Sequence, residues 1–431
     1  MPDPTADLTT LPERLDSMKR SLFSCVGIEL EYMLVDRHSL DVRAVADRVL
    51  HSAAGELTGE VERPPLGWSN ELALHVIELK TNEPVAALAN LERSFQRGIL
   101  EINELAAESQ ARLLPTAMHP WMDPDRELRL WPHDYNPVYE AFHRIFDCRG
   151  HGWANLQSCH INLPFEGDDE FVRLHSAIRV LLPLLPALAA SSPVMDGRLS
   201  GWCDTRMEVY RHNARRVPQV TGSVVPESVG SMDEYHERIL KPLYQAIAPH
   251  DTEEILQDEW LNARGAIARF ARQSIEIRVL DVQECPMADL AIASTAIAVL
   301  KQLTQERWSR LKDQQAIDTH ELAALLQRCT RHADKAMIDH PEFLRLLGIQ
   351  RRRATAGSVW EHLIESVRKL DDPDVAHYWR PLDALLRHGP LARRISDATG
   401  KYPDRSRLQE VYGQIADSLH AGTMFIPDID S

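Results

Sequence analysis

The sequence predicts an α+β fold, in which an antiparallel sheet carries helices on one face and a helical C-terminal region follows. Two observations lead to this class. Alternation of apolar and polar residues, which is typical of half-buried strands, recurs in separated stretches of the chain. Beyond residue 307 this alternation stops, and the remaining segments have helical periodicity. We therefore expect a sheet-containing part over 1–306 and a helical part over 307–431.

The first 150 residues are expected to mix strands and helices. The predicted elements are, in order, a strand at 23–35, a helix at 43–54, strand and turn at 66–80, a helix at 85–110, a short strand at 113–118 and a loop with one helix at 119–150. The long helix rests on Leu91, Phe95, Ile99 and Ile102, which lie at helical spacing. We place Pro84 in its first turn, where a helix tolerates proline.

Beyond residue 150 the sequence predicts two more strands and a larger number of helices. Two more strands are expected at 158–165 and 274–281, and the Gly-, Ser-, Pro- and Arg-rich stretch 193–230 is expected to be an extended loop region. Predicted helices occupy 168–190 up to its prolines, 231–248, 286–306, 319–331, 341–348, 358–370, 380–389 and 405–420.

Composition and charge exclude several classes of protein. The formal net charge of −16 argues against non-specific nucleic-acid binding, which needs a basic surface. The six cysteines are dispersed without a CxxC pair, as in a reduced cytosolic protein. The N-terminus lacks the pattern of a signal peptide, and the most apolar run, 180–190, is too short to span a bilayer. We expect a cytoplasmic protein with neither membrane nor nucleic-acid partners.

Three of the predicted strands share one design. Each has an apolar face suited to helix packing and an opposite face that carries polar or charged groups. Glu29 and Glu31 share a face in the first strand, and His160 and Asn162 share one in the third. In the last strand Ser274, Glu276 and Arg278 lie opposite Ile275, Ile277 and Val279.

Grouped carboxylates repel one another unless something neutralises them. Oxygen ligands with one imidazole suit Mg²⁺ or Mn²⁺ better than a closed zinc site. A fourth stretch, 70–80, adds Glu71 and Glu78. These two residues are seven apart and would face opposite sides of a regular strand, so both can serve one site only through a bulge or a break.

Each of these patterns also has an ordinary structural explanation. A single Glu-x-Glu on a strand is usually a solvated sheet face, and a single histidine such as His160 is usually a hydrogen-bonded, partly buried residue. Arg278 alone would most simply form an ion pair with Glu276. The metal-site interpretation rests on the recurrence of the pattern across several strands.

The same residues resemble the glutamate–cysteine ligase superfamily, including its second family and the carboxylate–amine ligases. The resemblance covers about residues 22–305, and its motifs occur in the family's order. They are GIELEYMLV at 27–35, ELALHVIELKTNEP at 71–84, MHP at 118–120, HINLPF at 160–165, ASSPVMDG at 190–197, the Arg206 region and IEIRVLD at 275–281.

The resemblance implies a glutamine-synthetase-like curved antiparallel sheet, with 1–306 as the catalytic ligase domain. Metal ligands are implied at Glu29, Glu31, Glu78, His160 and Glu276, and Glu71 stands where family members have an aspartate. Arg278 matches an arginine near the transferred phosphoryl group, and Glu276 and Arg278 are assigned as catalytic. Substrate-binding roles are assigned to Arg206, Asn162 and His119. Many carboxylate–amine ligases have His-x-His where this chain has Ser158-Cys159-His160, so the resemblance to that subgroup is weaker.

The implied activity is that of a ligase that uses ATP and Mg²⁺ (or Mn²⁺). It would join a glutamate-like acid to an amine or an amino acid such as cysteine through an acyl phosphate, and it could work as a homo-oligomer. No GxxxxGK[ST] motif occurs, so a nucleotide would have to bind by another route. Two alternatives stay open. One is a metal-dependent amide hydrolase, and the other is a catalytically inactive ligand-binding homologue.

Overall fold

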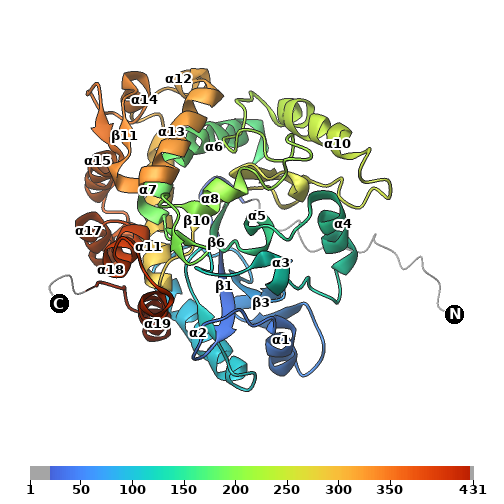
Figure 1. The fold of residues 1–431 in the computed structure, drawn as a ribbon. Helices are drawn as coiled ribbons and strands as arrows, with labels where there is room; N and C mark the ends of the chain where they lie inside the picture. The colour runs from blue at the N-terminus through green and yellow to red at the C-terminus, as the bar shows by residue number, and fades with distance from the viewer. Residues whose placement is uncertain (1–19, 428–431) are drawn as a thin grey trace.

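The computed structural model describes residues 20–427, and its centre is one large antiparallel sheet (Figure 1). Its strand order is β2-β3-β4-β1-β6-β10-β9, and β5 also pairs with β1. The strands are β1 (Gly27–Asp36), β2 (Glu60–Arg63), β3 (Leu66–Asn70), β4 (Val76–Thr81), β5 (Ala111–Leu114), β6 (Ser158–Pro164), β9 (Ala266–Arg269) and β10 (Ser274–Asp281). The predicted α+β class is confirmed, and the strand expected at 274–281 has those bounds.

Helices occupy most of the chain outside the sheet. In the first part they are α1 (Ala46–Ala54), α2 (Leu91–Ala107), α3 (Pro124–Glu127), α4 (Asn136–Phe146), α5 (His151–Ala154), α6 (Gly167–Leu181), α7 (Pro186–Ala189), α8 (Thr205–Tyr210), α9 (Met232–Tyr235), α10 (Lys241–Ile247) and α11 (Pro286–Thr304). In the last third they are α12 (Leu311–Ala316), α13 (Thr319–His332), α14 (Pro341–Leu346), α15 (Ala356–Arg368), α16 (Pro373–His377), α17 (Trp379–His388), α18 (Leu391–Thr399) and α19 (Arg405–Ala421).

One face of the sheet is apolar and packs against helices. Ile28, Leu30 and Tyr32 of β1 are fully buried there, in one core with the apolar side chains of α2, α6 and α11. Helix α11 is long and apolar enough to cross a membrane by length and composition, but 83% of its apolar window is buried inside the protein. Helix α11 is therefore the central core helix, and burial of its side chains is the main force that holds the helices on the sheet.

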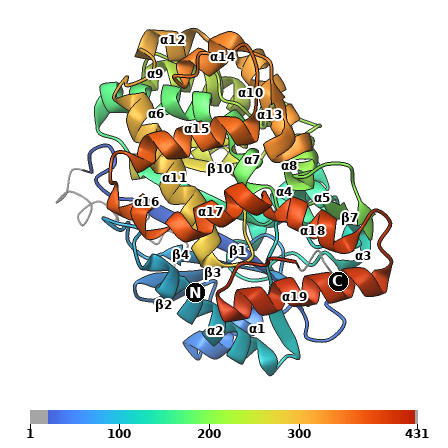
Figure 2. The same cartoon turned by 90° about the vertical axis from the view of Figure 1, so that its left-hand side faces the viewer.

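The helices of the last third lie over α11 and complete the same core. Figure 2 shows α15, α17, α18 and α19 in front of α11 and the strands. Trp360 and Tyr378 from this region are fully buried in the core that also holds β1. Helices α18 and α19 pack in addition on Met33 and Val35, at the far end of β1. The predicted boundary at 306 stays a prediction, and the two parts share a continuous core.

The sequence misplaced the start of the long helix. The prediction that Pro84 lies in its first turn is wrong, because α2 begins at Leu91. Val85 instead pairs with Val26, and the carboxylate of Asp374 accepts hydrogen bonds from the backbone of Leu88 and Ala89. These contacts from distant parts of the chain hold the segment before α2 in a non-helical conformation, which overrides its local helical spacing.

Shorter elements were also missed by the sequence. Strand β9 and helices α12, α16 and α18 were not predicted, and the stretch 119–150 contains two short helices instead of one. The last third also holds a two-residue strand pair, β11 (Met337–Ile338) with β12 (Ala354–Thr355). Elements of two to nine residues carry too few periodic positions to give a clear pattern.

Candidate functional site

Cross-strand register brings the predicted residues onto one face of the sheet. Glu29 lies opposite both Lys80 of β4 and His160 of β6. Glu31 lies opposite Glu78 of β4. Asn162, two residues after His160 in β6, lies opposite Glu276 of β10. Because directly opposed residues of antiparallel strands share a face, these side chains project together. This face carries the polar groups, as the sequence predicted, while Ile28 and Leu30 point to the helices.

Glu71 joins this face through a break in the sheet. Strand β3 ends at Asn70 and β4 begins at Val76, so Glu71 stands in the turn between them. Both Glu71 and Glu78 line the same cavity. The break that their seven-residue spacing required is therefore present.

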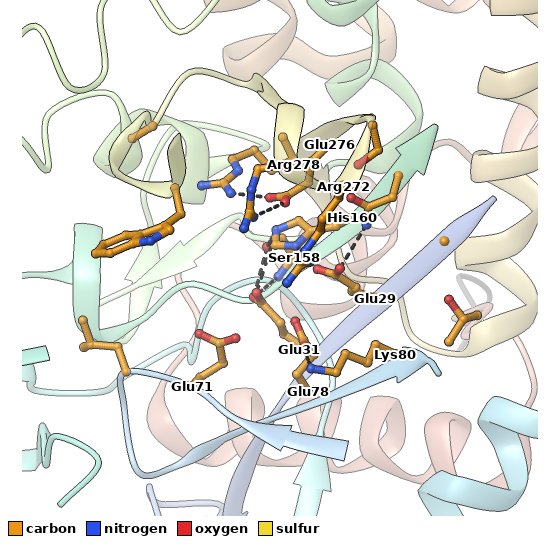
Figure 3. A pocket seen from close by; sticks show the side chains of 18 of the residues that line it. Glu29, Glu31, Glu71, Glu78, Lys80, Ser158, His160, Arg272, Glu276 and Arg278 are labelled. Atoms are coloured by element: carbon orange, nitrogen blue, oxygen red, sulfur yellow. Dashed lines mark hydrogen bonds and ion pairs between the residues drawn. The ribbon is translucent and has the colours of Figure 1, made fainter. Parts of the chain in front are cut away.

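The polar face forms the floor of a cavity of about 1000 Å³. Figure 3 shows Glu29, Glu31, Glu71, Glu78, His160, Glu276 and Arg278 around it. The cavity extends along the strands, and the register defines its two ends. The hairpin end, beyond Gly27, is lined by Thr81 and by the β9–β10 hairpin residues Arg272 and Gln273. The aromatic end, beyond Glu31, is lined by Tyr139, Phe142 and Trp153, and Trp260 lines the cavity beside Phe142.

Glu29 and His160 are closely paired. The Glu29 carboxylate accepts hydrogen bonds from His160 Nδ1 (2.8 Å) and Asn162 Nδ2 (2.9 Å). Burial raises the pKa of Glu29, but the hydrogen bond and positive charge of His160 outweigh it, so the net pKa is lowered. Burial likewise lowers the pKa of His160, but Glu29 and Glu31 raise it to about 9. Asn162, predicted to bind substrate, orients Glu29 and lines the cavity.

Glu276 is paired with two arginines. Its carboxylate contacts Arg278 and accepts a hydrogen bond from Arg269 Nη1 at 3.1 Å. Burial raises the pKa of Glu276, but Arg278, His160 and Arg269 lower it to about 2. The structure thus shows the ion pair between Arg278 and Glu276 that is the ordinary explanation of the two residues. Among the described residues, Glu276 is not in either group of side chains whose ligand atoms could hold a metal ion. Its role as a metal ligand stays a prediction.

The charges of Glu71 and Glu78 are compensated less fully. Burial and the neighbouring charges of Glu31 and Glu78 raise the pKa of Glu71 well above its ordinary value. Burial and Glu29 raise the pKa of Glu78 to about 7, although Lys80 lies 3.5 Å away and Ser69 Oγ donates a hydrogen bond of 2.7 Å. Negative charge is therefore in excess on this side of the site.

The arrangement fits a divalent cation. Ligand atoms of Glu29, Glu78 and His160 lie within 4.8 Å of one another, and so do those of Glu31, Glu71 and Glu78. Carboxylate oxygens are the donors that Mg²⁺ and Mn²⁺ prefer, and an added positive charge would lower the raised pKa values of Glu71 and Glu78. His160 would ligate as the neutral imidazole, after exchange of its contact with Glu29 or Ser158.

A β-bulge re-aims the end of β10. Ile277 pairs with Ile161 but Leu280 pairs with Cys159, so one extra residue is inserted between them. As a result Asp281 faces the same side as Ser158, whereas strict alternation would turn it away. Asp281 forms a 2.5 Å ion pair with Nε of Arg206, and the hydroxyl of Ser192 donates to it at 2.8 Å.

Arg206 is held at the edge of the cavity by this ion pair. It lies on α8, a helix inside the stretch that was predicted to be an extended loop. Its side chain is only 2% exposed, and within the described part of the chain its buried Nη2 has no hydrogen-bond partner. Of the other arginines in the stretch, Arg211 is paired with Glu208, and Arg216 Nη1 donates to the backbone of Ile145.

His119 does not belong to this site. It is fully buried, its Nε2 lies 2.8 Å from the carbonyl of Leu40, and its Nδ1 accepts from the backbone of Trp121. His119 is absent from the residues that line the cavity. The prediction that it binds substrate is corrected on this ground, because both ring nitrogens are already engaged by protein.

Other lining residues were missed by sequence reasoning. Lys80 is predictable from its register beside Glu29, and Ser158 from its position two residues before His160. Ser158 donates two hydrogen bonds to Glu31, at 2.7 and 3.0 Å. Arg269, Arg272 and the aromatic end come from segments that carry no recognisable motif, so only the fold brings them to the cavity.

Comparison with known proteins gives one consistent result. Residues 25–414 match the family described as glutamate–cysteine ligase family 2. A protein of Archaeoglobus fulgidus, whose name states no function, is 32% identical over 85% of this chain and 99% of its own length. A candidate glutamate–cysteine ligase 2 of Ruegeria pomeroyi is 25% identical over 90% of this chain and 85% of its own length.

The fold is also found among solved structures. The glutamate–cysteine ligase of Francisella tularensis, solved in complex with AMP, superposes with a TM-score of 0.58. The match covers 93% of this chain and 90% of that one, at 10% sequence identity. At that identity the likeness shows the fold, and it extends across the last third of the chain.

Proposed function

The chain belongs to the glutamate–cysteine ligase 2 family, and on that premise we propose that it is an ATP-dependent carboxylate–amine ligase. Its acid substrate would be glutamate or a related acid, and the product would be an amide. The observation that carries the proposal is the cavity itself, which combines a group of unneutralised carboxylates with the cations Arg278 and Arg206. The AMP bound to the F. tularensis ligase supports a nucleotide as the other substrate.

Each side of the polar face has a role in this proposal. Glu29, Glu31, Glu71, Glu78 and His160 would hold Mg²⁺ or Mn²⁺. A bound ion of this kind neutralises phosphate oxygens during phosphoryl transfer. Glu276 holds the Arg278 head group through an ion pair, and Arg269 in turn contacts Glu276. Arg278 would then stabilise the charge that develops on the transferred group.

Arg206 is suited to bind the acid. A buried guanidinium nitrogen without a partner is costly, and a substrate carboxylate would satisfy it. Asp281 occupies Nε of Arg206, and the carbonyl oxygen of Arg278 accepts from its Nη1 at 3.2 Å. The side chain is therefore fixed before any ligand binds, which lowers the entropic cost of recognition.

The proposed chemistry has two steps. A carboxylate oxygen of the acid attacks the terminal phosphorus of ATP, and the bond from that phosphorus to ADP breaks. The amine nitrogen then attacks the acyl carbon, the bond to phosphate breaks, and a proton passes from the nitrogen to solvent. Phosphoryl transfer asks the protein mainly for positioning and charge neutralisation, which are the properties that this cavity supplies.

A direct test follows ADP release by the purified protein with ATP, Mg²⁺ and a panel of acids. Hydroxylamine serves as a small amine that captures an acyl phosphate as a stable hydroxamate. Hydroxamate that depends on both ATP and an acid would support the proposal, and Arg278→Met should abolish it. Amide cleavage without ATP would favour the hydrolase instead, and calorimetric nucleotide binding without turnover would favour the inactive homologue.

A further inference from the structure

The aromatic end of the cavity points to a particular class of amine. We propose that the acceptor is an amine with a bulky apolar or aromatic side chain, and that this side chain binds among Phe142, Trp153 and Trp260. The inference rests on the proposed ligase function and deepens it, because the family resemblance by itself suggests cysteine.

The rings of this end form a continuous group. The ring centroids of Phe142 and Trp153 are 5.1 Å apart, and those of Phe142 and Trp260 are 5.7 Å apart. Phe146 stacks on Trp153 at 5.4 Å without lining the cavity. Such a group offers a large apolar contact area to another ring or to a branched aliphatic chain. A thiol as small as that of cysteine would use little of it.

Two polar groups of these walls already have protein partners. Trp153 Nε1 donates to the backbone of Asn213 at 2.9 Å, and the Tyr139 hydroxyl accepts from Asn70 at 3.0 Å. Further lining at this end comes from aliphatic side chains. They are Leu72, Ala73, Val76, Leu156, Leu261 and Ala263. Much of the surface that this end offers a ligand is therefore apolar, with Glu71 as a charged group beside it.

The position of these rings assigns them to the amine and not to the nucleotide. Cations that could contact phosphates line the middle of the cavity, where Lys80 lies opposite Glu29, and its hairpin end, where Arg269 and Arg272 lie. In phosphoryl transfer the attacking and leaving oxygens are roughly in line. With the nucleotide toward the hairpin end, the acid and the amine lie on the opposite side of the transferred group. That side is occupied by Arg206, Glu71 and the aromatic rings.

The acceptor class can be tested with a panel of amines at fixed ATP, Mg²⁺ and acid. The panel contains 2-phenylethylamine, phenylalanine and isoamylamine, with cysteine, serine and cadaverine for comparison. The kcat/KM of ADP release should be about tenfold or more higher for the apolar amines than for cysteine or serine, since a well-filled apolar pocket discriminates by about this factor. A preference for cysteine, serine or cadaverine would overturn the inference.

Variants then locate the pocket. Trp260→Ala and Phe142→Ala should each raise the KM of the preferred amine about tenfold and leave the KM of ATP unchanged. The ratio of hydroxamate formation to amine-dependent turnover should rise in both, because hydroxylamine has no side chain to bind. Phe146→Leu is the matched control and should keep the wild-type KM of the amine. A rise in the KM of ATP would assign the rings to the nucleotide base and overturn the inference.

Hydroxylamine also separates this inference from the proposed function. Hydroxamate formation together with a preference for small polar amines leaves the ligase function standing and removes only the apolar acceptor. Absence of hydroxamate with every acid tested removes the ligase function, and the apolar acceptor falls with it.

Discussion

Two sides of the same polar face differ in how their charges are balanced. On the paired side, Glu29 contacts His160, and Glu276 contacts Arg278 and Arg269. On the excess side, Glu71 and Glu78 are crowded with Glu31, and their pKa values are raised. The protein thus balances the charges on one side with its own cations, whereas on the other side Lys80 compensates Glu78 only in part. This difference indicates which groups are fixed in advance and which depend on a bound ion.

The largest effect is expected from breaking the paired side. Arg278→Met leaves the buried Glu276 with less compensation, and breaking a buried pair in this way costs about 3–5 kcal/mol of unfolding free energy. It also removes the proposed phosphoryl-group cation, so ATP turnover should fall by a factor of about 10²–10³. Chemical denaturation and ADP release measure the two effects.

A double variant separates stability from chemistry. Glu276→Gln combined with Arg278→Met removes both charges, so much of the lost stability should return while turnover stays low. Recovery of turnover in the double variant would contradict a role for Arg278 beyond charge balance.

A second prediction concerns the excess side. Glu71→Gln and Glu78→Gln should each weaken Mg²⁺ binding by about 10- to 100-fold, a loss already typical of groups that only support metal ligands. Titration calorimetry with Mg²⁺ and ATP measures this directly. Glu60→Gln is a matched control. Glu60 lines the same cavity and contacts Lys80, but it belongs to neither of the two groups of possible metal ligands. Equal losses in all three variants would mean that binding reflects general charge attraction.

A third prediction returns to a buried pair with a positioning role. Asp281→Asn frees Arg206 from its ion pair, and the KM of the acid should rise about tenfold while the KM of ATP changes little. Ser192→Ala removes the hydrogen bond to Asp281 and the one accepted from the backbone of Arg206 but keeps the charge of Asp281, so its cost should be only about 1–3 kcal/mol of unfolding free energy. If both variants bind the acid equally well, Arg206 does not need Asp281 to hold it.

The last effect concerns pH in the metal-free protein. A carboxyl whose pKa is raised on folding binds more protons in the native state, so it lowers stability as pH rises between its unfolded and folded pKa values. For Glu78 this window is from about 4.5 to about 7. Across this window the free energy of unfolding of the wild type should therefore fall by about 2 kcal/mol more than that of Glu78→Gln. Urea denaturation of the chelator-treated proteins at several pH values measures this difference. Parallel pH profiles would show that Glu78 is not perturbed.

The sequence revealed the polar face because strand alternation is a local property. Glu29, Glu31, His160, Asn162 and Glu276 each share a face with their neighbours two residues away, and the structure confirms that these faces coincide. The need for a break between Glu71 and Glu78 could be stated in advance for the same reason. The fold class followed from the same patterns.

Features that depend on strand pairing or tertiary burial could not be predicted. The bulge in β10 exists only in relation to β6, so strict alternation gave no reason to pair Asp281 with Arg206. His119 stands in a motif of the family, but whether its ring reaches a cavity depends on what packs around it. The aromatic end combines α4, α5 and a segment near Trp260, which are far apart in the chain.

The shared core has a consequence for how the protein is made. Glu284, just after β10, is fully buried and contacts Arg394 of α18, whose Nη1 also donates to the carbonyl of Phe425. A ribosome must therefore release more than a hundred further residues before Glu284 meets its partner. Until then Glu284 lacks its arginine partner and α11 lacks the helices that cover it. The cavity is therefore expected to complete its folding only when synthesis is almost finished, which exposes stalled or truncated chains to proteolysis.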